Sequence, residues 1–110
     1  MSLAALAALS LCPLASAAEA EVITTRYHCE RGVEVPVTYV NGVEPAVAVL
    51  MVENRMITLE QEVSGPGARY GWPSDGSHYV WWSKGDEAQL VWYDGEVGEE
   101  VTLLAFCEAE

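Results

Sequence analysis

Residues 64–90 hold the side chains of this sequence that are best suited to binding another molecule. The only lysine, Lys84, lies here. Three of the four tryptophans also lie here: Trp72, Trp81 and Trp82. A lysine ammonium is a compact cation with three hydrogen-bond donors, so it can pair with a carboxylate. Three turn-forming segments (65–67, 72–76 and 84–86) separate short apolar runs, and we expect these loop tips to meet at one end of a small β domain.

The charge balance limits the partners that such a surface could bind. Five cationic residues stand against seventeen acidic ones, for a formal net charge of −12. This field repels phosphate backbones and anionic membranes, which excludes nucleic acid as a partner, and it attracts a basic protein or a cation. Solubility alone is the alternative explanation of the charge.

No pattern in the sequence favours an enzyme. Asp86 and Glu87 could supply a carboxylate pair, but adjacent residues on a strand point to opposite faces and cannot act together on one substrate. His28 and His78 show no metal-ligand spacing with the cysteines, and no catalytic triad signature is present. We therefore expect no catalytic residue, no metal and no cofactor.

The N-terminal residues 1–18 read as a secretory signal peptide. Residues 3–14 form an apolar run that is too short to span a bilayer as a helix, and the small residues 15–17 match a signal-peptidase site, although no Lys or Arg precedes the run. Cys12 offers a lipid anchor as the alternative, but Leu11 before it is not the small residue that lipoprotein signals carry. We expect a free periplasmic or secreted protein with one domain, residues 19–110, bound to a membrane only if Cys12 is lipidated.

Two cysteines remain after residue 18, Cys29 and Cys107. Export to an oxidising compartment favours their pairing, with two independent buried thiols as the alternative. The bridge would close a loop of nearly the whole domain. By reducing the conformational entropy of the unfolded chain, such a bridge stabilises the folded protein by roughly 4 to 5 kcal/mol.

The domain itself is patterned as a series of β-strands. Asn41-Gly42 and Asp94-Gly95 each separate strand-like runs and favour two-residue type I′ hairpins, and Glu53-Asn54 offers another tight turn. Period-two alternation recurs from residue 33 onward and gives about eight strands. Because no segment after the signal shows helical periodicity, the fold class is all-β: an antiparallel barrel or a flattened two-sheet domain, with the disulfide tying the first strand to the last.

The same alternation predicts which side chains face the core. Ile57 and Leu59 should point inward, and Trp92 should pack inside together with Trp81 or Trp82. The last strand should present one face made of four alternate residues: Val101, Leu103, Ala105 and Cys107. Trp72 stands between Gly71 and Pro73 in a loop, where it is either a lid over the barrel mouth or an interface anchor.

Several of these segments together resemble a known family. The sequence has Tyr-His-Cys at 27–29, a valine-rich second strand ending in Tyr39, Gly-Ala-Arg-Tyr at 67–70, Trp-Ser-Lys-Gly-Asp-Glu-Ala at 82–88 and a late Cys107. This arrangement is similar to the MliC/PliC family of bacterial inhibitors of c-type lysozyme over nearly all of residues 19–110. The resemblance implies a small antiparallel eight-stranded β-barrel without a cofactor, whose loops carry a serine and a lysine into the lysozyme cleft.

The family pattern can be carried over residue by residue. Its lysine falls on Lys84, whereas its inserting serine falls on Pro66, so Ser64 or the backbone amides of Gly65 and Gly67 would have to supply the polar contact. Arg69 should brace the loop through an internal carboxylate or carbonyl. The lysozyme-binding residues that we predict are Lys84, Ser64, Gly65, Pro66, Gly67, Arg69, Tyr70 and Trp72.

The function that the resemblance implies is inhibition of a c-type lysozyme, a basic protein that the acidic chain would attract. Such an inhibitor protects bacterial peptidoglycan by occupying the active-site cleft of the lysozyme. The alternative is a cell-envelope protein-binding or assembly module that uses the same loops on another protein and has no enzymatic activity.

Overall fold

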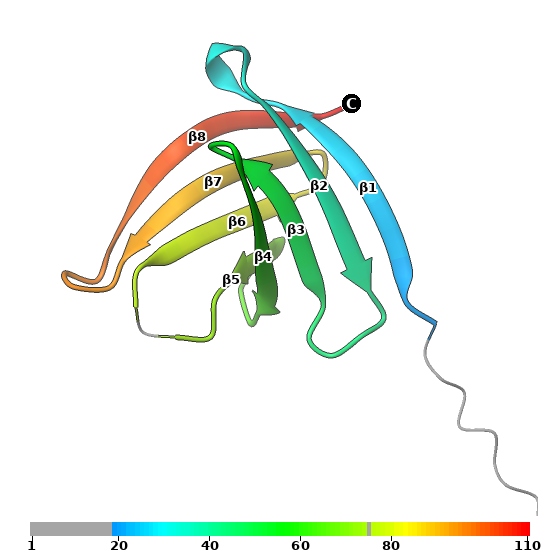
Figure 1. The fold of residues 1–110 in the computed structure, drawn as a ribbon, viewed down its shortest axis with the longest axis horizontal. Coiled ribbons are helices and arrows are strands. Elements are labelled where there is room, and N and C mark those ends of the chain that lie inside the picture. The colour runs from blue at the N-terminus through cyan, green and yellow to red at the C-terminus, as the bar shows by residue number, and fades with distance from the viewer. Residues whose placement is uncertain (1–18, 75) are drawn as a thin grey trace, which may run out of the picture.

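Eight strands pair in chain order and close into an antiparallel barrel in a computed structural model that describes residues 19–74 and 76–110 (Figure 1). The strands are β1 (Glu21–His28), β2 (Glu34–Asn41), β3 (Val47–Val52), β4 (Arg55–Glu62), β5 (Ala68–Gly71), β6 (His78–Lys84), β7 (Glu87–Asp94) and β8 (Glu99–Ala109). A short 3-10 turn, η1 (Glu30–Gly32), joins the first two. The predicted eight-stranded barrel is confirmed, and the flattened two-sheet alternative is not observed. The predicted signal peptide lies outside the described residues.

The barrel closes where the first strand meets the last. β1 pairs with β8 through only two register positions, Tyr27 with Ala109 and His28 with Glu108. The predicted disulfide between Cys29 and Cys107 is confirmed immediately beside this short seam, and it joins residues 78 positions apart. The seam between the chain ends is therefore covalent as well as hydrogen-bonded. Among the described residues, no helix has the length and apolar character needed to cross a membrane.

The barrel interior is filled by aromatic and aliphatic side chains that hydrogen-bond one another where they are polar. The Tyr39 hydroxyl accepts a 2.8 Å hydrogen bond from Trp81 Nε1 and shares a 2.7 Å hydrogen bond with the Tyr27 hydroxyl. Trp81 packs edge-on against Tyr27, and Tyr70 packs against Tyr39. Burial raises the pKa of Tyr27, and its hydrogen bond with Tyr39 raises it further. These residues come from β1, β2, β5 and β6, so one network ties both sides of the barrel together.

Two of the three predicted tight hairpins have longer connections than expected. Asn41-Gly42 is followed by an extended loop, because β3 begins only at Val47, and Asp94 pairs with Glu99 across four connecting residues. Each loop contains one glycine in the left-handed conformation: Gly42, with a φ of +79°, begins the first loop, and Gly98, with a φ of +70°, ends the second. The prediction at Glu53-Asn54 is confirmed: both residues have positive φ, as a type I′ turn requires.

The inward face of β8 differs from the predicted one. Leu104 and Cys107 are buried, whereas Val101 is 54% exposed. The β7–β8 ladder has two register shifts. In the first, a β-bulge, Ala105 and Phe106 together oppose Gln89, which moves the inward position from Ala105 to Leu104. The second lies between Leu104 and Thr102 and returns Val101 to the face of Trp92, so the exposure of Val101 reflects its place near the start of β8. The predictions for the other strands hold, since Leu59 and Trp81 are buried and Ile57 packs against the core. Trp92 is half-buried against Tyr79.

Candidate functional site

The connection between β4 and β5 lies directly beside the end of β6. Ala68 pairs with Ser83, which places the loop 64–67 next to Lys84. Gly67 has a φ of +80°, and a Cβ added there would lie 2.5 Å from the Ser83 carbonyl oxygen and 3.2 Å from Lys84 Cβ. A larger residue has neither the conformation nor the space to replace Gly67. The sequence prediction that the turns 65–67 and 84–86 meet is therefore confirmed.

Hydrogen bonds hold this loop in place from two sides. Trp82 Nε1 donates a 3.1 Å hydrogen bond to the Pro66 carbonyl oxygen, and Ser64 Oγ donates a weaker one, 3.4 Å, to the Gly67 carbonyl oxygen. Pro66 has no amide hydrogen, but its carbonyl anchors the loop on the outer face of β6. The indole of Trp82 thus acts as a support for the loop, on the opposite face of β6 from the buried Trp81.

Arg69 braces the base of the same loop, as predicted. Its guanidinium donates hydrogen bonds to the carboxylates of Glu62 on β4 and Glu100 on β8, and it lies 5.4 Å from the centroid of the Trp82 ring. Burial opposes the charged form, but the hydrogen bonds with Glu100 and Glu62 outweigh it and raise the pKa of Arg69. The side chain is mostly buried by these contacts, so Arg69 positions the loop from within the protein.

Lys84 differs from most other cations of the chain because its charge is not paired internally. Arg26, Arg31 and Arg69 each lie within ion-pair distance of a glutamate, whereas Lys84 takes part in no ion pair among residues 19–74 and 76–110. It is exposed at the end of β6, and Gly85 after it has a φ of +59° that turns the chain into β7. The ammonium group is therefore available to an anionic group of another molecule.

Two of the predicted binding residues lie elsewhere than expected. Tyr70 is 4% exposed and is part of the core, because the strand alternation that places Arg69 outside places Tyr70 inside. Its side chain cannot contact a partner. Trp72 is 48% exposed but follows β5 at the end away from Lys84, so residues 72–74 of the predicted turn do not join the other two turns. Asp75 of that turn lies outside the described residues. Hydrogen bonding of Gly95 to Ser77 instead links this connection to the β7–β8 turn.

A hollow of about 650 Å³ adjoins the loop 64–67 on the side away from Lys84. It is lined by residues 41–46 of the β2–β3 connection, by residues 61–64 and by Gly67. Val63, at its edge, is fully exposed. β4 ends at Glu62, just before it, and the Ser-Gly-Pro that follows Val63 is typical of a turn.

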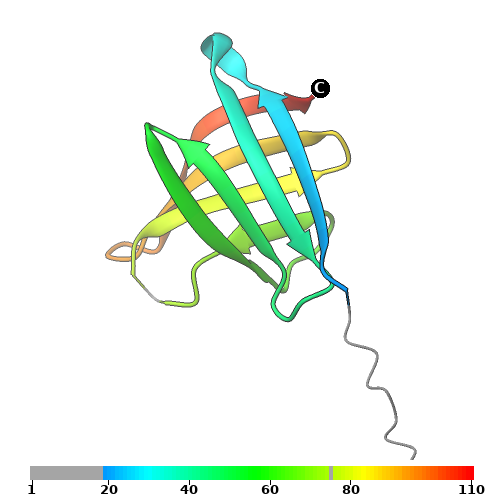
Figure 2. The same ribbon diagram turned by 45° about the vertical axis from the view of Figure 1, so that its right-hand side comes forward.

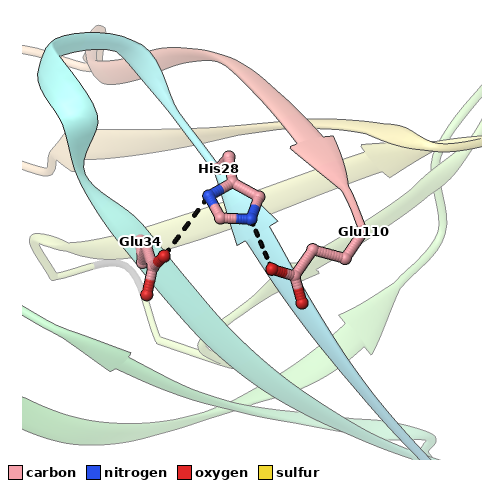
Figure 3. A group of neighbouring side chains, drawn as sticks. All are labelled: His28, Glu34 and Glu110. Atoms are coloured by element: carbon pink, nitrogen blue, oxygen red, sulfur yellow. Dashed lines mark hydrogen bonds and ion pairs between the residues drawn. The ribbon is translucent and has the colours of Figure 1, made fainter.

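The one group of described residues with potential metal ligands lies at the barrel seam. His28, Glu34 and Glu110 have ligand atoms within 4.8 Å of one another (Figure 3). Each ring nitrogen faces its own carboxylate, with Nε2 2.5 Å from Glu110 Oε1 and Nδ1 3.4 Å from Glu34 Oε1. Both ring nitrogens of His28 are thus already paired with a carboxylate of this chain. The arrangement is a hydrogen-bonded clasp between β1, β2 and the C-terminus.

These features define a class of protein before any relative is considered. A disulfide-closed barrel presents a rigidly supported loop beside a lysine that has no ion-pair partner within residues 19–74 and 76–110, which is the organisation of a binding protein. The sequence model of the family described as membrane-bound lysozyme-inhibitor of c-type lysozyme matches residues 27–97. This chain belongs to that family.

Two proteins named membrane-bound lysozyme inhibitor of C-type lysozyme are similar in sequence. The one from Cupriavidus necator is 34% identical over 98 residues, which cover 81% of this chain and 75% of that protein. The one from Pseudomonas aeruginosa is 36% identical over 73 residues, or 64% of this chain and 54% of the relative. Since the family is one of inhibitors, the chain is a binding protein rather than an enzyme.

Two solved structures share the barrel. PliC-St, the periplasmic lysozyme inhibitor of C-type lysozyme from Salmonella typhimurium, aligns with a TM-score of 0.67 at 26% identity, covering 82% of this chain and 99% of that one. Pseudomonas aeruginosa MliC, solved in complex with hen egg white lysozyme, aligns with a TM-score of 0.61 at 28% identity, covering 84% and 86%.

Proposed function

We propose that this protein binds c-type lysozyme and inhibits it by placing Lys84 and the loop 64–67 in the active-site cleft. The observation that carries the proposal is the exposed ammonium of Lys84, which has no ion-pair partner in the described part of the chain and lies beside a loop fixed by Gly67 and Trp82. Membership in a family of lysozyme inhibitors supplies the class of target.

The chemistry of the target explains why a lysine would inhibit it. A c-type lysozyme holds a glutamic acid and an aspartate on either side of the scissile bond, and the aspartate is ionised in the working enzyme. An ammonium placed between them pairs with the aspartate and fills the space that the sugar needs. Ser64, or the backbone amides of Gly65 and Gly67, donates the second polar contact in place of the family serine.

The rigid support of the loop adds to the affinity. Gly67 is packed against β6, and Pro66 is anchored by Trp82 with its backbone angle fixed by the ring. A loop that already holds its bound conformation loses little entropy on binding. Arg69 contributes by positioning this loop, because its charge is already satisfied by Glu62 and Glu100.

We place the protein in the bacterial cell envelope, as a periplasmic or secreted molecule exported by residues 1–18. The disulfide between Cys29 and Cys107 supports an oxidising compartment. Mass spectrometry of the protein recovered from the producing cell would read out the mature N-terminus, and an acylated Cys12 would contradict a free product.

Lysis of a bacterial cell-wall suspension by hen egg white lysozyme tests the inhibition. The parent protein should slow the loss of turbidity, and Lys84→Ala should weaken binding by about 2 kcal/mol or more, roughly 30-fold, because a desolvated carboxylate loses its partner. The free energy of unfolding should change by no more than about 0.5 kcal/mol, as at other exposed positions.

Arg55 provides a matched control. It is also exposed and takes part in no ion pair among the described residues, but it lies beside Tyr79 at the opposite end of β6 from Lys84. Arg55→Ala removes the same charge and should leave inhibition unchanged. If Lys84→Ala inhibits as well as the parent does, insertion of Lys84 is wrong. If the parent does not inhibit lysozyme at all, a role for these loops in binding another protein of the cell envelope becomes the favoured hypothesis.

A further inference from the structure

One residue of β8 holds a conformation that its side chain disfavours. Phe106 has a φ of +54° and is 81% exposed. It lies in the β-bulge, where Ala105 and Phe106 together oppose Gln89 of β7. A bulky residue rarely adopts positive φ, and a bulge can redirect a side chain. The fold therefore holds an aromatic ring in solvent at a cost in backbone strain, and such strain is concentrated at functional positions.

The ring of Phe106 forms one wall of a groove that begins at Lys84. This groove, of about 680 Å³, crosses the outer face of three strands, with Trp82 and Lys84 of β6 on one side and Phe106 of β8 on the other. Ala88 and Gln89 of β7 lie between them. The groove is thus continuous with the surface that we assign to lysozyme binding, and Trp82 belongs to both.

The end of the groove nearest Lys84 is acidic. Glu87 and Glu108 face each other in the β7–β8 register, and both are exposed. Neither carboxylate takes part in an ion pair within residues 19–74 and 76–110. Glu87 also lies opposite Lys84 in the β6–β7 register, without an ion pair between the two among the described residues. Like charges directly opposite each other on neighbouring strands are destabilising, and a cation from a partner beside Glu108 would relieve the repulsion that remains.

We infer that the groove between Trp82 and Phe106 is a second contact region for the lysozyme, outside its catalytic cleft. It receives an apolar side chain of the lysozyme surface that is flanked by a cationic residue: Phe106 packs against the apolar group, while Glu87 and Glu108 bind the cation. This inference rests on the proposed function, and it assigns a partner surface that does not depend on the catalytic carboxylates.

Phe106→Asn tests the contact, because asparagine tolerates positive φ but lacks the ring. The variant should bind hen egg white lysozyme about tenfold or more weakly, as expected for loss of an aromatic anchor. Its melting temperature should rise by roughly 4 °C or more as the strain is relieved. Weaker binding by a more stable protein cannot come from misfolding.

Two further variants separate the ring from other effects. Phe106→Tyr keeps the ring and should bind within about twofold of the parent. Val101→Asn replaces another exposed apolar residue of β8, outside the groove, and should leave affinity unchanged. Unchanged lysozyme affinity in Phe106→Asn would overturn the inference while leaving Lys84 insertion intact.

Two other outcomes also contradict the inference. A parent protein that fails to bind lysozyme overturns it together with the proposed function. A parent protein that is dimeric by analytical ultracentrifugation, with a monomeric Phe106→Asn variant of equal lysozyme affinity, would assign the groove to a second copy of this chain instead.

Discussion

Single residues of this barrel show two opposite treatments of polar groups. Inside, the hydroxyls of Tyr27 and Tyr39 and the indole nitrogen of Trp81 satisfy one another at 2.7 and 2.8 Å. Outside, Lys84 is left without an ion-pair partner among the described residues. A buried polar group without a hydrogen-bond partner inside the fold would destabilise the protein, whereas an exposed one is hydrated and remains able to bind another protein.

The tyrosine network predicts a loss of stability at alkaline pH. Burial raises the pKa of Tyr27, and also that of Tyr70, above the ordinary value of 10.0. Above pH 10 the unfolded chain releases these protons while the folded protein retains them, so the stability present below pH 10 falls as pH rises. For Tyr27, whose pKa is raised the most, the slope should approach about 1.4 kcal/mol per pH unit. Urea unfolding between pH 8 and pH 11 measures it.

Tyr27→Phe is the control for this prediction. It removes the phenol with the raised pKa but leaves the hydrogen bond from Trp81 to Tyr39 in place. The variant should therefore lose less stability between pH 10 and pH 11 than the parent does. Equal unfolding free energies for the parent at pH 8 and pH 11 would contradict the role of burial.

Residue type singled out Lys84 and the two cysteines, whereas the bracing role of Arg69 was expected only once the family resemblance had been drawn. The disulfide and the contacts of Arg69 are confirmed, and the binding role of Lys84 stays a prediction. Phe106 could not be found in this way. Its exposure depends on where the β7–β8 ladder slips, and the register of Ala88 with Cys107 is a property of two paired strands rather than of either sequence. Tyr70 was misplaced for a simpler reason: the alternation that puts Arg69 outside should already have placed its neighbour in the core.

At the scale of elements, the connections were harder to predict than the strands. Asn41-Gly42 and Asp94-Gly95 are the strongest short hairpin signals in the sequence, yet both belong to longer loops, while the less typical Glu53-Asn54 forms the two-residue turn. Turn dipeptides permit a conformation, but the register of the flanking strands decides how many residues must be spanned. The pairing of Ala68 with Ser83 likewise decides which of the expected loops meet: it places the loop 64–67 beside Lys84, whereas Trp72 follows the other end of β5.

The packing of the loop 64–67 against β6 leads to a prediction at this scale. In Gly67→Ala the new Cβ would stand 2.5 Å from the Ser83 carbonyl oxygen at a φ of +80°, so the loop must move away from Lys84. We expect a loss of about 1–2 kcal/mol in stability from the backbone strain and at least a tenfold loss of lysozyme affinity. Calorimetry of unfolding and of binding measures both.

Gly32→Ala is the control that distinguishes the effect of backbone strain from the effect of displacing the loop 64–67. Gly32 has a φ of +68° and open space around it, in the β1–β2 connection. Its substitution should destabilise the protein by a similar amount through conformation alone and leave affinity unchanged. If both variants bind lysozyme as the parent does, the conformation of the loop 64–67 does not contribute to binding.

For the whole molecule, closure of the barrel at the β1–β8 seam keeps the strands that carry the proposed binding loops in place. The ends of β1 and β8 lie side by side near the C-terminus (Figure 2), and their seam has only two register positions. The Cys29–Cys107 bridge lies next to this seam, and the amide of Ala109 in β8 donates a hydrogen bond to the Asp86 carbonyl oxygen in the β6–β7 turn. The bridge therefore holds in place the strand that supports the Lys84 turn. The all-β class and the approximate number of strands could be predicted because they depend on a pattern repeated over many residues. The pattern left a barrel and a flattened two-sheet domain open, and the family resemblance implied the eight-stranded barrel. The disulfide was predicted from the count and placement of two cysteines in an exported chain.

The net charge of −12 leads to the last prediction, which concerns the rate of association. A strongly acidic protein attracts a basic lysozyme over distances comparable to the Debye length, about 30 Å at 0.01 M and 8 Å at 0.15 M salt. Raising salt over this range should lower the association rate constant by roughly tenfold and change the dissociation rate constant much less. Stopped-flow fluorescence with hen egg white lysozyme measures both constants. Lys84→Ala should show the opposite pattern, with faster dissociation and a nearly unchanged salt slope, because the inserted lysine acts after encounter. An association rate that does not respond to salt would reduce the acidic surface to a determinant of solubility.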